Sequence, residues 1–254
     1  MKITFLGTGT SQGVPVIACD CEVCQSDDKN DKRLRSSILI EYRAQTIVID
    51  TGPDFRCQML RQNVRELDAV LLTHSHKDHI AGLDDVRAFN FKQERNMPIY
   101  ASEDTITALK REFYYAFSDV YYPGIPRLEV HAIRAGESFW IKDISVMPVQ
   151  VMHHKMPVLG FRIADFTYIT DAKTVDKENK KLIEGTNTLV VNCLQEDPHL
   201  SHFTLEEALD FINQIKPEKA YLTHISHRLG LHKNIQKRLP EGVEVASDGL
   251  VINI

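Results

Sequence analysis

The chain has 254 residues, 43% of them hydrophobic and 26% charged, which is ordinary for a soluble globular protein with a sizeable core. A formal net charge of −5 argues against a dedicated nucleic-acid binder, which normally carries a basic face. No apolar stretch is long enough for a signal peptide or a membrane span. We therefore expect a cytoplasmic protein without a membrane segment, with cysteines that are reduced.

The first half of the chain is predicted to alternate strands with helices. A glycine-rich turn and a loop with three cysteines follow the first strand, and a histidine-rich loop follows the buried strand that opens 68–83. Apolar runs and alternation predict strands at 2–7, 36–42, 46–52 and 97–102, and helical spacing predicts helices at 55–63 and 103–117.

The second half continues the same alternation. It contains predicted strand pairs at 139–154 and 159–172, strands at 186–194 and 219–226, an amphipathic helix at 204–215 and a closing strand within 243–254. We find no linker and no repeat, so we expect one domain over 1–254 with layered α/β packing. Several strands end in His, Asp or Cys, which is a common place for functional groups.

The segment 73–79 reads THSHKDH and carries the strongest chemical signal. Its residues His74, His76, Asp78 and His79 are nitrogen and oxygen ligands that suit zinc, manganese or iron. Alternate residues of an extended loop point the same way, so His74 and His76 can reach one ion together. Asp78 and His79 begin the next turn and point to a second ion. Packing alone does not explain four such residues in six.

Two adjacent ions need more ligands, and strand ends elsewhere supply them. The candidates are His153 or His154, Asp171 and His224. Each one alone would more often be a structural or surface residue. Together they complete two sites that share a carboxylate.

Three of the five cysteines lie within the segment VIACDCEVC at 16–24. Cys19, Cys21 and Cys24 are typical of a metal clip, but a tetrahedral zinc site needs a fourth ligand and nothing nearby supplies it. Cys57 and Cys193 lie in apolar stretches and are predicted to be core residues.

Along its whole length the chain resembles the metallo-β-lactamase-fold hydrolases. The resemblance implies an α/β fold, a four-layer αββα sandwich, with two divalent ions, zinc or manganese. It implies that His74, His76 and His153 bind one ion and Asp78, His79 and His224 the other, with Asp171 bridging. Asp50 in VIDTG matches an aspartate that orients the ligands.

The stretch FLGTGTSQGVPVIACDCEVC narrows the resemblance. It looks like the start of the phosphoribosyl cyclic phosphodiesterase group associated with the carbon–phosphorus lyase pathway. That group has a structural zinc, and its fourth ligand would be His227 in THISH, completing a Cys₃His site with Cys19, Cys21 and Cys24. The segment HHKMPVLGF resembles the group's ligand segment in a way that favours His153 over His154 as the metal ligand. The segment SHF at 201–203 stands where the group has a histidine that acts on the phosphate, which makes His202 the candidate for that role.

The resemblance implies a phosphodiesterase that cleaves a small phosphodiester, with a cyclic sugar phosphate as the group's substrate class. A hydroxide on the two ions would attack phosphorus, with Asp78, Asp171 and His202 as catalytic residues. A tRNA 3′-processing nuclease is the main alternative, because its start and ligand set are similar, although the net charge disfavours nucleic acid. The third alternative is a metal-binding or scaffold protein without catalytic activity.

The segment at 113–128 is rich in tyrosine and phenylalanine and does not match the group. We expect it to be core and a packed loop. A wall of the substrate pocket or a contact in a homodimer are the alternatives.

Overall fold

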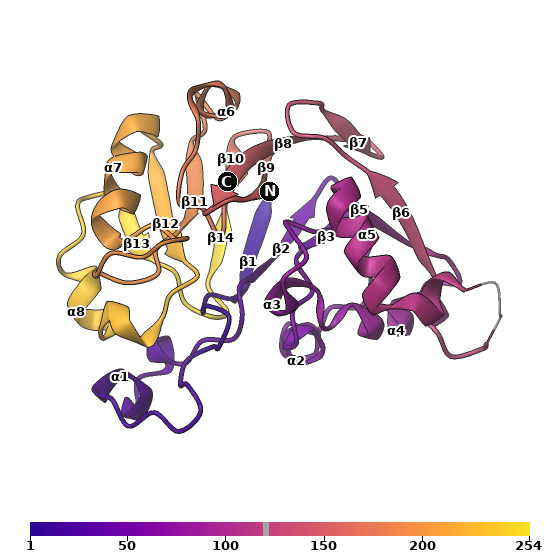
Figure 1. Cartoon of the computed structure of the whole chain (residues 1–254), viewed down its shortest axis with the longest axis horizontal. Coiled ribbons are helices and arrows are strands. Elements are labelled where there is room, and N and C mark those ends of the chain that lie inside the picture. The colour runs from indigo at the N-terminus through magenta and orange to yellow at the C-terminus, as the bar shows by residue number, and fades with distance from the viewer. Residues whose placement is uncertain (119–121) are drawn as a thin grey trace.

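The computed structural model describes residues 1–118 and 122–254. Within these residues the strands form two sheets of seven strands each, which lie face to face (Figure 1). In the first sheet the order is β14-β1-β2-β3-β4-β5-β6. Its strands are β1 (Lys2–Gly7), β2 (Ser37–Tyr42), β3 (Gln45–Ile49), β4 (Ala69–Leu71), β5 (Met97–Ala101), β6 (Leu128–Ala132) and β14 (Val251–Asn253).

The second sheet has the order β13-β12-β11-β10-β9-β8-β7. Its strands are β7 (Phe139–Ile141), β8 (Ile144–His153), β9 (Met156–Ile163), β10 (Phe166–Tyr168), β11 (Thr188–Asn192), β12 (Lys219–Thr223) and β13 (Val243–Val245). Strands β10 to β13 run parallel, whereas β7, β8 and β9 form antiparallel pairs. In the first sheet β14, β1, β2 and β3 form antiparallel pairs and β3 to β6 run parallel, so both sheets are mixed.

Helices cover the outer face of each sheet, on opposite sides of the molecule in Figure 1. The first sheet carries α2 (Phe55–Arg61), α3 (Lys77–Ile80), α4 (Arg87–Gln93) and α5 (Glu103–Glu112). The second carries α6 (Lys177–Leu182), α7 (Leu205–Ile215) and α8 (His232–Gln236). The short α1 (Glu22–Gln25) lies apart, in the cysteine loop.

Three buried apolar clusters correspond to the three interfaces between four layers. Side chains alternate along each strand, so Ile47 and Ile49 of β3 enter the core between the sheets, whereas Val48 packs against the helices. Strands covered on both faces read as continuous apolar runs, as β3 and β4 do. The predicted four-layer αββα sandwich is confirmed.

The end of the chain differs from the prediction. A single closing strand was expected within 243–254, but this stretch contains β13 and β14, which belong to different sheets. A turn at 247–249 separates them, and Gly249 adopts a positive φ of 89° there, which glycine tolerates well. The stretch Ser247-Asp248-Gly249 is a turn signal that the prediction did not use, although it says nothing about which sheet the next strand joins.

Segment 113–128 was predicted to be core and a packed loop. Residues 119–121 lie outside the described part of the chain. In the remainder, Phe113 is buried and Tyr114 and Tyr122 are exposed, so the aromatic residues are divided between core and surface. The helix predicted over 103–117 ends at Glu112 and a 3₁₀ turn follows it, while Leu128 begins β6, an edge strand that the prediction missed. No helix in the described residues is long and apolar enough to cross a membrane.

The central core gives a direct test of the sandwich. Phe161 on β9 is fully buried between the sheets, whereas Trp140 on β7, the edge strand of the same sheet, is 63% exposed. We expect Phe161→Ala to lower the free energy of unfolding by about 3–5 kcal/mol, because it leaves a cavity. Trp140→Ala should change it by less than about 1 kcal/mol. Urea unfolding monitored by circular dichroism measures both, and equal losses would contradict the assigned core.

Candidate metal centre

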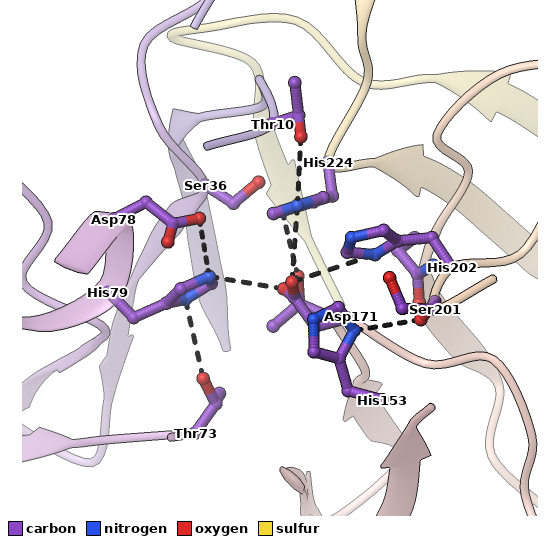
Figure 2. A network of polar contacts seen from close by, with 12 residues as sticks. Thr10, Ser36, Thr73, Asp78, His79, His153, Asp171, Ser201, His202 and His224 are labelled. Atoms are coloured by element: carbon purple, nitrogen blue, oxygen red, sulfur yellow. Dashed lines mark hydrogen bonds and ion pairs between the residues drawn. The ribbon is translucent and has the colours of Figure 1, made fainter. Parts of the chain in front are cut away.

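Polar residues from both sheets meet at one edge of the sandwich, where several strands end. The THSHKDH loop follows β4, Asp171 comes three residues after β10, and His224 directly follows β12. His153 ends β8, and His202 lies in the loop before α7. Figure 2 shows these side chains converging from separate elements of the fold. Residues far apart in sequence are thus assembled by the meeting of the two sheets.

One group of ligand atoms comprises Asp78, His79, Asp171 and His224, whose ligand atoms all lie within 4.8 Å of one another. His79 Nε2 is 3.0 Å from Asp78 Oδ2 and 3.3 Å from Asp171 Oδ2. His224 Nε2 is 3.3 Å from the other oxygen, Asp171 Oδ1. The two oxygens of Asp171 therefore face different histidines of this group.

Histidine rings gather on the other side of Asp171. The ring centroids of His74 and His76 are 4.6 Å apart, and those of His76 and His153 are 5.2 Å apart. His153 also belongs to a group with Asp171 and His202, whose ligand atoms lie within 4.8 Å of one another. The structure thus brings the predicted ligands together around Asp171, and it places the exposed His76 at the solvent side.

Hydrogen bonds orient three of the rings. His79 Nδ1 lies 2.7 Å from Asp50 Oδ2, and His153 Nδ1 donates to the Ser201 carbonyl at 2.9 Å. His74 Nδ1 lies 3.0 Å from the hydroxyl of Thr73, which itself donates to Asp50. A hydrogen-bond acceptor beside Nδ1 holds the ring proton on Nδ1, which leaves the unprotonated Nε2 free to bind a metal. Sequence reasoning found Asp50 but missed Thr73 and the Ser201 carbonyl, for which the sequence carries no distinct signal.

Close backbone packing holds the Asp50 loop against the THSHKDH loop. A Cβ at Gly52 would lie 2.1 Å from the Asp78 carbonyl oxygen, and one at Gly82 would lie 2.1 Å from the Gly52 oxygen. Only glycine permits these approaches. Asp50, Asp171 and His224 also adopt positive φ angles of 65°, 55° and 57°, a conformation that costs free energy and clusters at functional sites.

The site fits divalent metal ions. Among the described residues, His74 Nε2 is a buried nitrogen without a hydrogen-bond partner, which is rare unless something else satisfies it. Burial alone lowers the pKa of an imidazole, but the carboxylates of Asp171 and Asp50 outweigh it and raise the pKa of His79 well above its ordinary value. Surroundings that raise the pKa of His79 this strongly carry excess negative charge, which a bound cation would balance. Imidazole and carboxylate are zinc and manganese donors.

Asp171 remains a carboxylate in this environment. Burial opposes its ionisation, yet His224 and His79 outweigh burial and lower the pKa of Asp171 well below its usual range. Thr170 Oγ1 also donates to Asp171 Oδ2 at 2.6 Å. The ring nitrogens of His224 lie 3.3 Å from Thr10 Oγ1 and 3.4 Å from Thr170 Oγ1. Neither threonine was predicted.

His202 lies inside the ligand cluster. Its ring stacks on His224 with centroids 4.9 Å apart, and its Nδ1 is 3.8 Å from Asp171 Oδ1. Burial, followed by the nearby His224, lowers the pKa of His202 to about 3. The ring is therefore neutral, and its buried Nδ1 has no hydrogen-bond partner among the described residues. This position suits both a metal ligand and a group that contacts substrate.

The adjacent histidines His153 and His154 lie in different surroundings. His153 turns toward His74, His76 and His202, whereas His154 is exposed in the turn between β8 and β9. Of the two, His153 therefore lies beside the other predicted ligands.

A second cluster joins the N-terminal loop to the segment after β12. His227 Nδ1 lies 3.2, 3.3 and 3.5 Å from the sulfurs of Cys19, Cys21 and Cys24, and these four form a group that could hold an ion. The Cys24 N–H lowers the pKa of the Cys21 thiol to about 6, whereas burial raises that of Cys24 to about 11. Three sulfurs and one nitrogen are a zinc donor set.

The remaining cysteines were both predicted to be core residues. Cys193 is buried, as predicted. Cys57 is exposed, so that prediction was wrong. It lies on α2, whose buried face is made by Phe55, Gln58 and Met59, and the apolar neighbours in sequence therefore point away from it.

Comparisons with known proteins agree with this architecture. Residues 45–225 match the family model of the β-lactamase superfamily domain. The crystal structure of a diphosphatase from the PhnP family superposes with a TM-score of 0.93 and 37% identity, over 99% of this chain and 96% of that one.

Two curated relatives match as well. The octanoyltransferase of Porphyromonas gingivalis is 38% identical over 252 residues, which are 98% of this chain and 51% of that protein. The ribonuclease Z of Acaryochloris marina is 31% identical over 173 residues, which are 65% of this chain and 48% of that protein. The chain spans about half the length of these relatives. From the family match and the close structural similarity, the chain belongs to the β-lactamase superfamily and is a metallo-β-lactamase-fold hydrolase of the PhnP family.

Proposed function

We propose that the protein is a dinuclear metal-dependent phosphodiesterase that hydrolyses a small phosphodiester. The observation that carries the proposal is the position of Asp171, which belongs both to the group of Asp78, His79 and His224 and to the group of His153 and His202. A carboxylate shared by two groups of ligand atoms would allow two ions to be held next to each other. The similarity to a PhnP-family diphosphatase supports phosphorus as the reacting centre.

The ligand assignment follows the two groups around Asp171. His74, His76 and His153 would hold one ion, and Asp78, His79 and His224 the other, with Asp171 shared. When bound, such ions supply a water of lowered pKa and offset the charge that grows on the phosphoryl oxygens. Zinc and manganese both suit these donors.

The protein's own groups keep this arrangement rigid. Asp50 accepts from the Thr73 N–H at 2.9 Å and lies 2.7 Å from His79, so a buried carboxylate fixes the start of the THSHKDH loop. His202 is neutral and close to Asp171, and it would contact the phosphate or the leaving oxygen. Groups held in place before substrate binds need no reorganisation during the reaction.

For the substrate, we propose a small molecule whose phosphorus carries two substituents, with a cyclic sugar phosphate as the first candidate. The resemblance of residues 5–24 to the cyclic phosphodiesterase group supports this choice. A diphosphate shares the disubstituted phosphorus, and the PhnP-family neighbour is a diphosphatase.

We also propose that Cys19, Cys21, Cys24 and His227 hold a structural zinc. Such a site has four protein ligands and no open position, so it serves as a brace. The brace would tie the N-terminal loop to the segment that carries His224, only three residues before His227.

A tRNA 3′-processing activity is the second candidate. It is favoured by the ribonuclease Z relatives, which are about 30% identical over 65% of this chain. The net charge of −5 disfavours it, because tRNA binding depends on neutralising phosphates with basic residues.

Turnover on a substrate panel tests the proposal. We expect zinc- or manganese-loaded protein to hydrolyse bis(p-nitrophenyl) phosphate and to leave a 5′-labelled tRNA precursor intact. Metal analysis of protein purified without chelator should give about three ions per chain. Specific tRNA cleavage would instead establish the second candidate, and no hydrolysis by any metal form would refute both.

The adjacent histidines offer a matched pair of variants. We expect His153→Ala to remove about one ion per chain and to lower diester turnover by at least about 100-fold, because an active-site ligand is lost. His154→Ala should keep the full metal content and activity, because His154 is exposed in the turn. Metal analysis and initial rates compare the two, and a reversed result would move the ligand to His154.

The structural zinc is tested with two cysteine variants. Cys21→Ser should release one zinc and lower the midpoint of thermal unfolding, because a structural metal contributes directly to folding. Cys57→Ser is the control, since this thiol is exposed and outside the cluster. An unchanged zinc count in Cys21→Ser would rule out the proposed site.

A further inference from the structure

Thr10 lies beside the metal centre, in the turn that follows β1, and its hydroxyl faces His224 (Figure 2). Thr10 Oγ1 is 3.3 Å from His224 Nε2, and the residue is only 8% exposed. The same Nε2 is 3.3 Å from Asp171 Oδ1. Among the described residues the hydroxyl has no other hydrogen-bond partner. The ligand assignment gives this buried hydroxyl no role.

Backbone hydrogen bonds hold Thr10 against the segment that carries His224. The Thr10 N–H donates to the Ile225 carbonyl at 3.0 Å, and the Ile225 N–H donates to the Thr8 carbonyl at 2.9 Å. The Gly13 N–H donates to the Thr10 carbonyl at 2.8 Å, so both backbone groups of Thr10 are satisfied. The position of the hydroxyl is therefore set by the fold, before an ion or a substrate binds.

The hydroxyl of Thr10 is the donor in its contact with His224. Thr170 Oγ1 donates to Asp171 Oδ2 at 2.6 Å, so its proton is in use and it can only accept from His224 Nδ1, 3.4 Å away. The ring proton is therefore on Nδ1, and Nε2 carries a lone pair that accepts from Thr10. When Nε2 holds an ion, that lone pair is occupied, and the Thr10 proton needs a new acceptor.

A buried hydroxyl that loses its acceptor costs free energy unless another acceptor takes its place. In the proposed reaction the group that arrives beside the ion is a phosphate, whose oxygens accept hydrogen bonds and gain negative charge. We propose that the Thr10 hydroxyl donates a hydrogen bond to a phosphoryl oxygen of the substrate, on the His224 side of Asp171. This inference rests on the proposed phosphodiesterase function and adds a phosphate contact to the one assigned to His202.

Two variants of Thr10 test the contact. Valine has the shape of threonine without the hydroxyl, whereas serine keeps the hydroxyl. We expect Thr10→Val to lower kcat/KM for bis(p-nitrophenyl) phosphate by about 10- to 100-fold, the effect of losing one hydrogen bond to a charged group. Thr10→Ser should keep most of the activity, because the donor remains. The metal content should be unchanged in both variants, because every assigned ligand is intact.

Binding of inorganic phosphate gives a readout that does not depend on turnover. Protein loaded with cobalt(II), which the same donors accept, reports binding through its visible absorption spectrum. We expect the dissociation constant of phosphate to rise by about tenfold or more in Thr10→Val and to change little in Thr10→Ser. Ser11→Ala is the matched control and should bind phosphate as the wild type does. Ser11 is the next residue, is exposed, and has no side-chain hydrogen bond among the described residues.

Two results would overturn the contact. The first is a Thr10→Val variant that binds phosphate and hydrolyses the diester as well as the wild type. The second is a Thr10→Val variant that loses an ion, because the hydroxyl would then support the metal rather than the substrate. If the wild type hydrolyses no diester in any metal form, the proposed function fails. The phosphate titration still decides the contact in that case, since weaker binding in Thr10→Val supports it and equal binding refutes it.

Discussion

The ionised carboxylate of Asp171 is the feature on which the geometry of the site depends. It is almost fully buried and is held between His79, His224 and the group of His153 and His202. Burial of a lone carboxylate is costly, so this position is tolerable only where polar or charged partners surround it. These partners come from the loop after β4 and from the C-terminal ends of β12 and β8. The meeting of the two sheets at one edge is therefore a requirement of the chemistry as well as of packing.

The same constraint explains the unusual backbone near the site. Asp50 and Asp171 adopt positive φ angles, and Gly52 and Gly82 allow backbone contacts that a Cβ would prevent. Rigid sheets and three apolar clusters hold these loops in place, so stability elsewhere compensates for local strain. Histidines whose Nδ1 protons are already engaged can then present Nε2 in fixed directions.

Much of this was predictable because the signals are local. The THSHKDH spacing and the thiols of 19–24 identify ligand types without knowledge of the fold. The strand ends offered Asp171 and His224 as candidates, and the family resemblance supplied His227. The Asp-Gly turn between β13 and β14 is visible in the sequence, but the change of sheet was not predictable, since the turn does not show which sheet the next strand joins. Thr73 and the Ser201 carbonyl were missed because their roles depend on contacts across the fold. Cys57 was misassigned because apolar neighbours in sequence say little about which face of a helix a residue occupies.

Residues 224–227 connect the two ligand clusters. His224 faces Asp171 and His227 faces the three thiols, so one short segment contacts both clusters. A zinc at the cysteine cluster would thus help to fix the position of His224, three residues before His227. On this argument the brace belongs beside the substrate rather than at a distant surface, because there it stabilises the groups whose positions matter most.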